Sequence, residues 1–490
     1  MSSDEKPMSE LPIHIEKGAK LEPDSVEVTD QGNLAIEKAL NRKYDFRILP
    51  CLFLLYFFSF MDRASIGNAS IAGLNVDLKL RGQSYSVALA LFFVCYMIVD
   101  IPAGLLFKII GPRAFLCISI FCFGTCTICL GFVKNASQLY AIRCLLGLFE
   151  GGLTPCISIY MGMFYSPTNI QRRLAFYYCA APLSGAVGGL LASGLGKINV
   201  GSYRAWPWIF FVEGTISILV GALCFFILPN MPGQSRFLTE EEREVARVRS
   251  GKISNTVDVN HEKEKFSWKA VKQGFQDWNA VLLAIISVGT YCNVYAYSLF
   301  SPAIIKGFGY STIRSQLLSV PPYVFGAICV FATSFASDHL RVRGPFVMGP
   351  CCVEVIGWII QMTCNGVGVR YFGLFLIAGS IYPAINSTSS WLIGNLQPHY
   401  VRATGISFAV AMGTIGGIIS TFTYANAKGD VANGVELAMA VLVIALTGLL
   451  MWINRAENKL RARGGRDYRL NQGQSAEQLG SRHPAYVLSL

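Results

Sequence analysis

The sequence alternates between long apolar runs and shorter polar connections. About twelve runs hold some 20 mainly apolar residues each, and a helix of that length crosses a hydrocarbon core of about 30 Å at about 1.5 Å per residue. This pattern predicts an all-α integral membrane protein with twelve transmembrane helices. The spans centre near Leu55, Leu91, Phe123, Leu148, Leu183, Leu219, Ser287, Phe325, Trp358, Leu376, Val410 and Val443.

Polar segments divide these spans into two sets of six. In the linker between the sets, Thr239 and Glu242 have the spacing of a helix capping box, and Phe266–Val271 has the pattern of a short interfacial amphipathic piece. Similar Gly/Pro-bearing basic loops (Gly104–Arg113 and Ser337–Pro345) follow the second and eighth spans, as a duplicated six-span unit predicts. The predicted parts are a disordered tail (1–44), a six-helix bundle (45–229), a linker (230–277), a second six-helix bundle (278–455) and a mobile tail (456–490).

The positions of basic residues predict the orientation. The chain has 41 Lys and Arg against 30 Asp and Glu, a formal net charge of +11. Short loops alone do not decide the orientation. Basic residues also gather before the first span, in the linker and after the last span, and an even number of spans places these three regions on one side. Because cytosolic flanks are rich in Lys and Arg, we expect both termini in the cytosol, with the plasma membrane as the location. The dispersed basic residues do not predict nucleic-acid binding.

Four ionisable residues interrupt the apolar runs. They are the adjacent pair Asp62 and Arg63 in the first run, and Arg143 with Glu150 in the fourth. A charge in hydrocarbon costs about 2.5–3.5 kcal/mol even on mild scales. Such residues therefore face a polar cavity, pair with each other, or handle ions and substrate. Two acids and two arginines are what a proton-coupled carrier of anions requires.

Other chemistry finds little support in the sequence. Of the 15 cysteines, Cys117, Cys122, Cys126 and Cys129 lie in one apolar run without His or carboxylate, where Cys behaves as a small hydrophobe. We therefore predict no metal site and no cofactor. The sequence has no Walker loop, HExxH motif or nucleophile elbow, so we predict that the chain is not an enzyme.

Five stretches of the sequence carry a family resemblance: Met61–Ala69, Arg143–Gly152, Trp206–Gly214, Phe237–Arg243 and Trp391–Leu396. Together they resemble the major facilitator superfamily, and more narrowly its anion:cation symporter family, in the fungal allantoate, nicotinate and pantothenate permease branch. Three positions depart from that pattern: Ser65 and Pro207 replace the usual Asn and Arg, and Lys108 holds the place of an Asp. Ser65 is near the predicted site, so it leaves the substrate open.

The spacing of the charged residues predicts one site. Arg143 and Glu150 are seven residues apart, which is nearly two helical turns, so both point from one face. Gly147 between them allows close approach of a helix or a substrate. Counting from the outer ends of the two spans places Asp62 level with Arg143, Glu150 near the midplane, and Arg63 free to face the cavity.

The resemblance implies roles for these residues. Asp62 and Glu150 correspond to the proton-coupling acids, Arg63 to the arginine that meets the substrate carboxylate, and Arg143 to a balancing charge. An arginine stays charged and offers a planar fork to a carboxylate, while a carboxyl group in low dielectric binds a proton more readily. The alternative is a static ion-pair network that fixes helix packing.

Further polar residues in the spans are weaker candidates. Beside Arg63 and Arg143, which we predict to bind the substrate, we predict substrate contacts for Asn68, Asn293, Tyr297 and Asn386. Tyr291, Tyr295, Ser387 and Thr388 lie nearby in the two C-terminal spans that carry Asn293 and Asn386. Glu354 is a gating or interface candidate. Gating or structural roles are predicted for Asp100, Glu213, Asp338, Arg341, Trp391 and Asn395.

Taken together, these features predict a monomeric secondary transporter in the lipid bilayer, driven by the proton gradient. The favoured function is proton symport of a small organic anion such as nicotinate, pantothenate, allantoate or a related compound, by alternating access. One alternative is an exporter of an organic acid or secondary metabolite. A non-transporting sensor of the same fold ranks last because the C-terminal tail is short.

Overall fold

The computed structural model describes residues 23–165, 170–196, 198, 205–235, 237–243, 246, 272, 274–340, 342–397, 399–426, 429–472 and 479–490. Among these residues all regular elements are helices, and no strand occurs. Eleven helical stretches are long and apolar enough to cross a membrane. Helix α3 supplies a further span, of which Ser84–Asp100 is the apolar part. The predicted all-α membrane architecture is confirmed.

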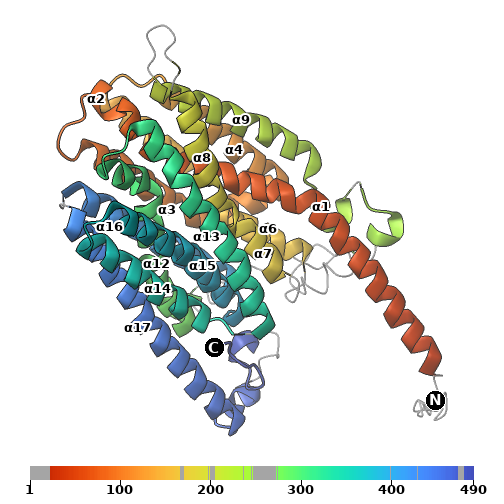
Figure 1. The fold of residues 1–490 in the computed structure, drawn as a ribbon. Coiled ribbons are helices and arrows are strands. Elements are labelled where there is room, and N and C mark those ends of the chain that lie inside the picture. Colours follow the sequence, from red (N-terminus) through yellow and green to blue (C-terminus); the bar gives the residue numbers. More distant parts are fainter. Residues whose placement is uncertain are drawn as a thin grey trace, which may run out of the picture.

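The helices form two halves that follow each other along the chain (Figure 1). A π-helical turn, η1 (Ser70–Leu74), joins α1 to α2 in the first half, and the short 3₁₀ helix η2 (Pro232–Gln234) follows the last helix of that half. The first half contains α1 (Pro23–Ala69), α2 (Asn75–Asp77), α3 (Ser84–Ile110), α4 (Pro112–Leu130), α5 (Ala136–Glu150), α6 (Leu153–Phe164), α7 (Ile170–Tyr178), α8 (Ala180–Leu195) and α9 (Ala205–Ile227). The second contains α12 (Trp278–Gly307), α13 (Thr312–Leu340), α14 (Pro345–Thr363), α15 (Val367–Asn395), α16 (His399–Asn426) and α17 (Gly429–Ala462).

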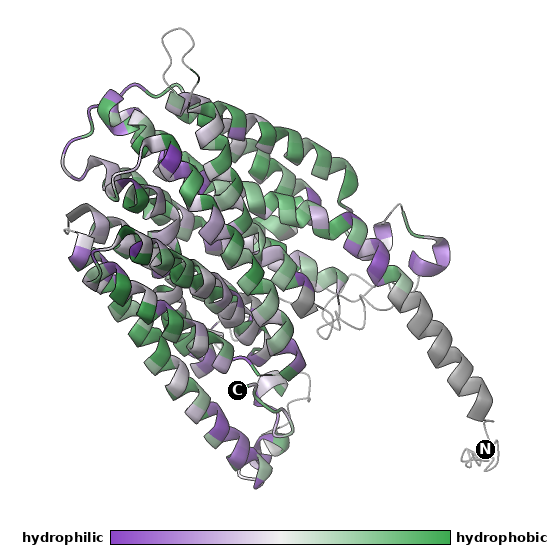
Figure 2. Ribbon diagram, viewed as in Figure 1, coloured by the Kyte–Doolittle hydropathy of each residue, from purple (hydrophilic) through white to green (hydrophobic). Residues whose placement is uncertain are grey.

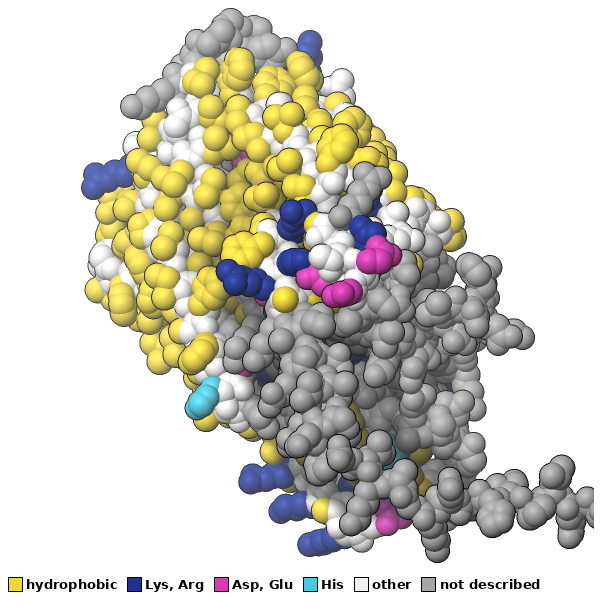
Figure 3. All heavy atoms as spheres, turned by 90° about the vertical axis from the view of Figure 1, so that its right-hand side faces the viewer, with side chains coloured by type: hydrophobic (Ala, Val, Ile, Leu, Met, Phe, Trp, Pro, Cys, Tyr) yellow, Lys and Arg dark blue, Asp and Glu magenta, His cyan; other side chains and the backbone are white. Residues whose placement is uncertain are grey.

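The outer faces of the helices are apolar, as a lipid-facing surface requires. Green hydrophobic segments dominate the helices in Figure 2, and hydrophobic side chains cover a broad area of the face in Figure 3. Phe226 is 82% exposed and Ile109 81% exposed. Large apolar side chains exposed in such numbers mark a membrane-facing surface.

The two halves meet at the end of the molecule that carries α2. There Lys306 Nζ donates to the carbonyl of Ile71 at 2.9 Å, and Gln316 Nε2 donates to the carbonyl of Asn68 at 3.5 Å. Helix α8 packs against α13 and α3 packs against α16 across the same interface. The described start of α1 and the C-terminal segment Leu479–Leu490 lie at the opposite end (Figure 1).

Outside the spans the structure confirms one prediction and corrects two. Thr239 N donates to Glu242 Oε2 at 2.9 Å and Glu242 N donates to Thr239 Oγ1 at 3.3 Å, which is the predicted capping box. Residues 23–44 belong to α1 rather than to a disordered tail, and Lys43 there pairs with Glu242 at 2.6 Å. The predicted mobile tail is wrong as well, because α17 continues to Ala462, η3 (Asp467–Gln472) and η4 (Gly480–Arg482) follow, and the chain end is docked. The amphipathic piece Phe266–Val271 lies outside the described residues.

Candidate functional site

The four ionisable residues predicted from the apolar runs lie in the interior of the N-terminal half. Helix α1 carries Asp62, 1% exposed, and Arg63, 4% exposed. Helix α5 carries Arg143, 1% exposed, and Glu150, fully buried. Each charge is therefore withdrawn from water and lipid, so its neighbours decide its energy.

Arg63 and Glu150 form an ion pair between α1 and α5. The distance from Arg63 Nε to Glu150 Oε1 is 2.6 Å, and the Ser59 hydroxyl donates to the same carboxylate oxygen. In this conformation Glu150 occupies one edge of the Arg63 guanidinium, and the predicted orientation of Arg63 toward a cavity stays a prediction. A buried pair with added hydrogen bonds compensates the desolvation that either charge alone would suffer.

Arg63 also links the two halves of the molecule. Its Nη1 donates to the hydroxyl of Tyr295 on α12 at 2.8 Å. Tyr295 is 2% exposed, and its ring lies 4.7 Å from the ring of Phe93 on α3. A single guanidinium thus contacts an acid of one half and a phenol of the other.

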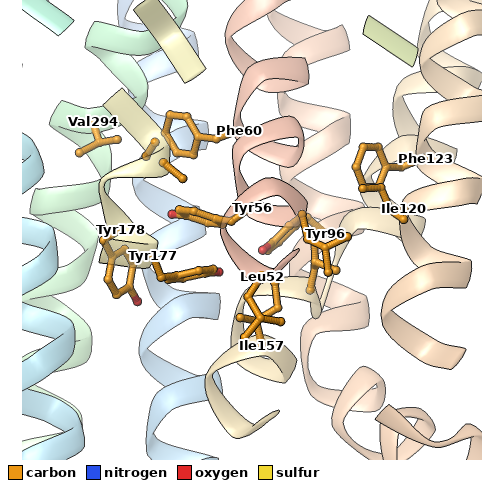
Figure 4. Packing of buried hydrophobic residues seen from close by; sticks show 14 of the residues in the cluster. Leu52, Tyr56, Phe60, Tyr96, Ile120, Phe123, Ile157, Tyr177, Tyr178 and Val294 are labelled. Carbon is orange, nitrogen blue, oxygen red and sulfur yellow. The ribbon is translucent and has the colours of Figure 1, made fainter. Parts of the chain in front are cut away.

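Aromatic rings surround this pair. The Arg63 guanidinium carbon lies 4.8 Å from the ring centroid of Tyr96 and 5.7 Å from that of Phe60. The rings of Tyr56 and Tyr177 stack with their centroids 4.3 Å apart, and Figure 4 shows Tyr56, Phe60 and Tyr96 in one buried cluster. Ring faces attract a cation, so the cluster favours the arginine while it excludes water.

Asp62 lies in a second polar group on the other side of α1. The Thr127 hydroxyl of α4 donates to Asp62 Oδ2 at 2.8 Å. Ser65, one turn along α1, donates to Glu213 Oε1 of α9 at 2.5 Å. Asp62 Oδ1 and Glu213 Oε2 are buried and have no hydrogen-bond partner among the described residues. These two acids therefore retain acceptor capacity.

Arg143 differs from Arg63 in having no acid in contact. Within the described part of the chain it forms no ion pair, and its Nε and Nη2 have no hydrogen-bond partner. It attracts Asp62 and Glu150 only through longer-range electrostatics. Arg143 thus faces both acids at longer range than an ion pair, and its predicted role as a balancing charge stays a prediction. Its Nε and Nη2 are available to an anion.

Glycines shape the backbone around Glu150. A Cβ on Gly147 would lie 2.3 Å from the Phe92 carbonyl oxygen, so the predicted close approach of another helix is confirmed and the helix is α3. The backbone of Gly152 has a φ of +79°, a left-handed conformation that glycine adopts without strain. The fourth span is consequently not one helix: α5 ends at Glu150 and α6 begins at Leu153.

The predicted substrate-contact residues are arranged in different ways. Asn68 and Tyr297 are buried, and the Asn68 Oδ1 and Tyr297 hydroxyl have no partner among the described residues. The Asn293 amide is occupied, because its oxygen accepts from Trp358 Nε1 at 3.0 Å and its nitrogen donates to the Gly289 carbonyl. Asn386 donates to Ser334 Oγ at 2.7 Å.

The predicted gating or structural residues also separate. Asp100 is fully buried on α3, and neither carboxylate oxygen has a hydrogen-bond partner in the described residues. Asp338 pairs with Arg343 at 2.7 Å in the connection between α13 and α14. Arg341 lies outside the described residues. Trp391 and Asn395 bind the backbone of the C-terminal segment.

Sequence reasoning missed three parts of this arrangement. It gave no role to Ser59 or Thr127, because hydroxyls are common in transmembrane helices and carry no distinguishing signal. It also missed Glu436, a fully buried acid on α17 whose Oε1 lies 3.6 Å from Cys292 Sγ. Glu436 interrupts an apolar run, so the criterion that selected Asp62 would have found it.

Comparison with known proteins places the chain among transporters. Residues 52–421 match the family described as Major Facilitator Superfamily. The chain is 34% identical to a protein named high-affinity nicotinic acid transporter from Saccharomyces cerevisiae, over 86% of this chain and 79% of that protein. It is 32% identical to the major facilitator-type transporter hxnP of Emericella nidulans, with 83% of each chain covered.

Solved structures of low sequence identity share the fold. The xylose transporter XylE from E. coli, in a partially occluded inward open conformation, matches with a TM-score of 0.67 at 15% identity, over 84% of this chain and 97% of that chain. A bacterial homologue of the human lysosomal transporter Spinster matches with a TM-score of 0.62 at 14% identity, over 82% and 96% of the respective chains.

Proposed function

This chain belongs to the Major Facilitator Superfamily, and we propose that it is a proton-coupled symporter of a small organic anion. The observation that carries the proposal is the buried contact of Arg63 with Glu150 and Tyr295, one partner in each half. An arginine that holds an acid in the substrate-free state offers an anion a place, provided that the acid is neutralised. Proton uptake and anion binding are then linked.

The proposed cycle begins with competition for Arg63. A substrate carboxylate pairs with the planar guanidinium and displaces Glu150. Glu150 is fully buried, and a buried carboxylate without a cation is strongly destabilised, so it takes up a proton. Release of the anion reverses both steps, because Arg63 again attracts the ionised Glu150. Asp62, with one unpartnered oxygen, supplies a second proton position.

Arg143 supplies a second cation for the substrate. Its unpartnered Nε and Nη2 are buried, and they attract any anion that enters between α1 and α5. The rings of Tyr96, Phe60 and Tyr56 nearby favour a flat, weakly hydrated molecule. The two arginines suit a small carboxylate such as nicotinate, pantothenate, allantoate or a related compound. Of these, nicotinate is the flat aromatic one, and one relative is named a nicotinic acid transporter.

The position of the contacts between the halves indicates which end of this conformation is closed. These contacts lie at the α2 end, opposite to the described start of α1 and the C-terminal segment. With the termini in the cytosol, as the positive flanks predict, this conformation is closed toward the outside. We propose import across the plasma membrane by a monomer, with the halves moving around the Arg63 site.

Uptake of radiolabelled carboxylates tests the proposal. Cells that express the chain are assayed with nicotinate, pantothenate and allantoate at acidic and neutral outside pH, beside Arg63→Ala. We expect one compound to be taken up faster at acidic pH and the variant to be inactive. If the surface-expressed protein takes up none of them, or if uptake is independent of pH, the symport proposal is wrong, and efflux from loaded cells becomes the assay.

A further inference from the structure

The C-terminal segment Leu479–Leu490 is bound to the end of the C-terminal half. Leu479 and Leu488 are 2% exposed and Ser481 is 4% exposed, whereas Val487 is 76% exposed. The segment therefore presents one side to the protein and the other to solvent. Its contacts reach the connection before α14, the end of α15 and the end of α17.

Two asparagines bind the backbone of this segment in the same way. Asn395 of α15 accepts from Ser489 N at 2.8 Å and donates to Ser489 O at 3.1 Å. Asn458 of α17 accepts from Leu488 N at 2.9 Å and donates to Leu488 O at 2.8 Å. Trp391 Nε1 adds a bond to Ser489 O at 2.9 Å. Because side-chain amides replace the partners of an extended strand, docking requires this backbone geometry.

Arg461 fixes the first part of the segment. Arg461 is 9% exposed, and its Nε lies 3.0 Å from Glu457 Oε1. Its Nη1 donates to the carbonyls of Ser481 at 2.9 Å and Tyr486 at 2.8 Å. Undocking would leave these buried donors and those of Trp391 and Asn395 to water alone, so the docked state is specific rather than incidental.

The segment also holds the connection between α13 and α14. The backbone N–H groups of Arg343 and Gly344 donate to the Leu490 carbonyl at 2.6 and 3.1 Å. The Arg343 side chain in turn pairs with Asp338 at 2.7 Å and donates to Ser337 at 2.8 Å. This connection lies at the terminus-bearing end, which has to close against the other half when the α2 end opens.

We propose that Leu479–Leu490 is an intramolecular clasp that slows the exchange between the two conformations of the transporter. It joins the α13–α14 connection to α15 and α17, so the connection cannot rearrange unless these bonds break or the three elements move together. Trp391 and Asn395 are its receptor residues. The inference rests on the proposed transport function, but its test measures docking and conformational exchange without any transported compound.

Docking is tested by cysteine labelling with a membrane-impermeant maleimide in inside-out vesicles. Leu488→Cys and its exposed neighbour Val487→Cys are compared, with labelling quantified on the C-terminal peptide by mass spectrometry. We expect Leu488→Cys to react many-fold more slowly than Val487→Cys, and Asn458→Ala or Arg461→Gln to remove the difference. Equal rates in the otherwise unchanged chain would overturn the proposal, because the segment would not be docked.

Exchange is tested at the opposite end with a buried reporter. Ser319 on α13 is 1% exposed and faces Gly189 of α8, so Ser319→Cys becomes reactive when the halves separate there. We expect deletion of residues 479–490, and independently Asn458→Ala, to raise its labelling rate from outside several-fold, with the melting temperature preserved in at least the point variant. An unchanged or lower rate in a folded variant would overturn the clasp and leave the segment a structural element only.

Discussion

In the N-terminal half, the buried acids Asp62, Glu150 and Glu213 share the interior with Arg63 and Arg143. In the C-terminal half, the buried acids Glu354 and Glu436 have neutral partners among the described residues. Trp358 Nε1 lies 3.2 Å from Glu354 Oε1, and Cys292 Sγ lies 3.6 Å from Glu436 Oε1. These acids of the N-terminal half lie on its first, fourth and sixth spans, whereas those of the C-terminal half lie on its third and sixth spans. Among the described residues, only the first set has arginines beside it.

This difference separates two uses of a buried carboxyl group. An acid beside an arginine has a charged state that the fold supports, so it can change protonation when the arginine changes partner. An acid with only an indole or a thiol has no such support, so the neutral form is favoured throughout. We therefore propose that coupling belongs to the N-terminal half, and that the C-terminal half contributes hydrogen bonding and closure through Tyr295.

The largest expected effect comes from neutralising Glu150 of the N-terminal half, compared with neutralising Glu436 of the C-terminal half. Glu150→Gln should abolish proton-driven accumulation of the transported anion but leave exchange of internal for external anion, because the amide keeps the size while it cannot release a proton. Both quantities are measured in proteoliposomes with an imposed pH gradient. The matched control is Glu436→Gln, which should retain accumulation within about twofold, since about 0.4 kcal/mol or less is expected from replacing a neutral acid by an amide. Loss of accumulation in the control would break the comparison.

Removing the Tyr295 hydroxyl should have a smaller effect, a rise of roughly tenfold in KM. Tyr295→Phe removes the hydroxyl that accepts from Arg63 at 2.8 Å, and a hydrogen bond to a charged group contributes about 1.5 kcal/mol, roughly tenfold in affinity. We expect KM for the anion to rise by about this factor while the maximal rate changes less. Tyr291→Phe, one turn earlier on α12, is the control and should leave KM near its original value. An equal rise in both variants would remove Tyr295 from the site.

A conformational effect of intermediate size is expected where the halves touch. A Cβ on Gly67 would lie 2.3 Å from the Leu299 carbonyl oxygen, so Gly67→Ala forces α1 and α12 apart. We expect faster labelling of the Ser319→Cys reporter from outside, because the state closed at the α2 end is destabilised. Gly194→Ala, where no atom lies within 4 Å of the added carbon, serves as control. Unchanged labelling with Gly67→Ala would show that this contact does not set the conformational equilibrium.

The smallest effect is expected at the surface of the N-terminal half. Partial burial raises the pKa of Glu242, whereas the hydrogen bond from Lys43 and the charge of Lys43 lower it, and the net shift is downward. A carboxyl group with a lowered pKa stabilises the fold above its unfolded pKa, and this contribution is lost as pH falls through the folded pKa. Lys43→Ala should reduce stability by less than about 1 kcal/mol, and the difference from the original chain should disappear below about pH 4. Thermal unfolding in detergent at several pH values measures it.

The span number, the capping box and the selection of Asp62, Arg63, Arg143 and Glu150 followed from local patterns. The pairing did not. Residue spacing fixes which side chains share one helix face, but the rotation of α1 against α5 and α12 decides that Arg63 meets Glu150 and Tyr295. That rotation depends on packing between residues far apart in the chain, such as Gly147 against Phe92, which no single stretch of sequence encodes.

The docking of the C-terminal segment could not be predicted from the sequence, for a different reason. Its polar composition is typical of disorder, but its docking uses backbone carbonyls and N–H groups that every residue has. The sequence analysis selected Trp391 and Asn395 as candidate residues, but it did not identify the C-terminal segment as their partner. Similarly, the only sequence signal for the break between α5 and α6 is the pair Gly151 and Gly152, and a continuous transmembrane helix also tolerates glycines.

In the proposed transport site, the contact of Gly147 with Phe92 fixes α5 against α3. Because no methyl group fits between α5 and α3 there, the wall that holds Glu150 cannot yield to a bulkier molecule without separating two helices. Any widening of the cargo range has to come from the opposite wall, where side chains such as Tyr295 and Tyr56 occupy space that smaller residues would vacate. Homologues that accept larger anions should therefore keep glycine at this position and differ in the aromatic residues.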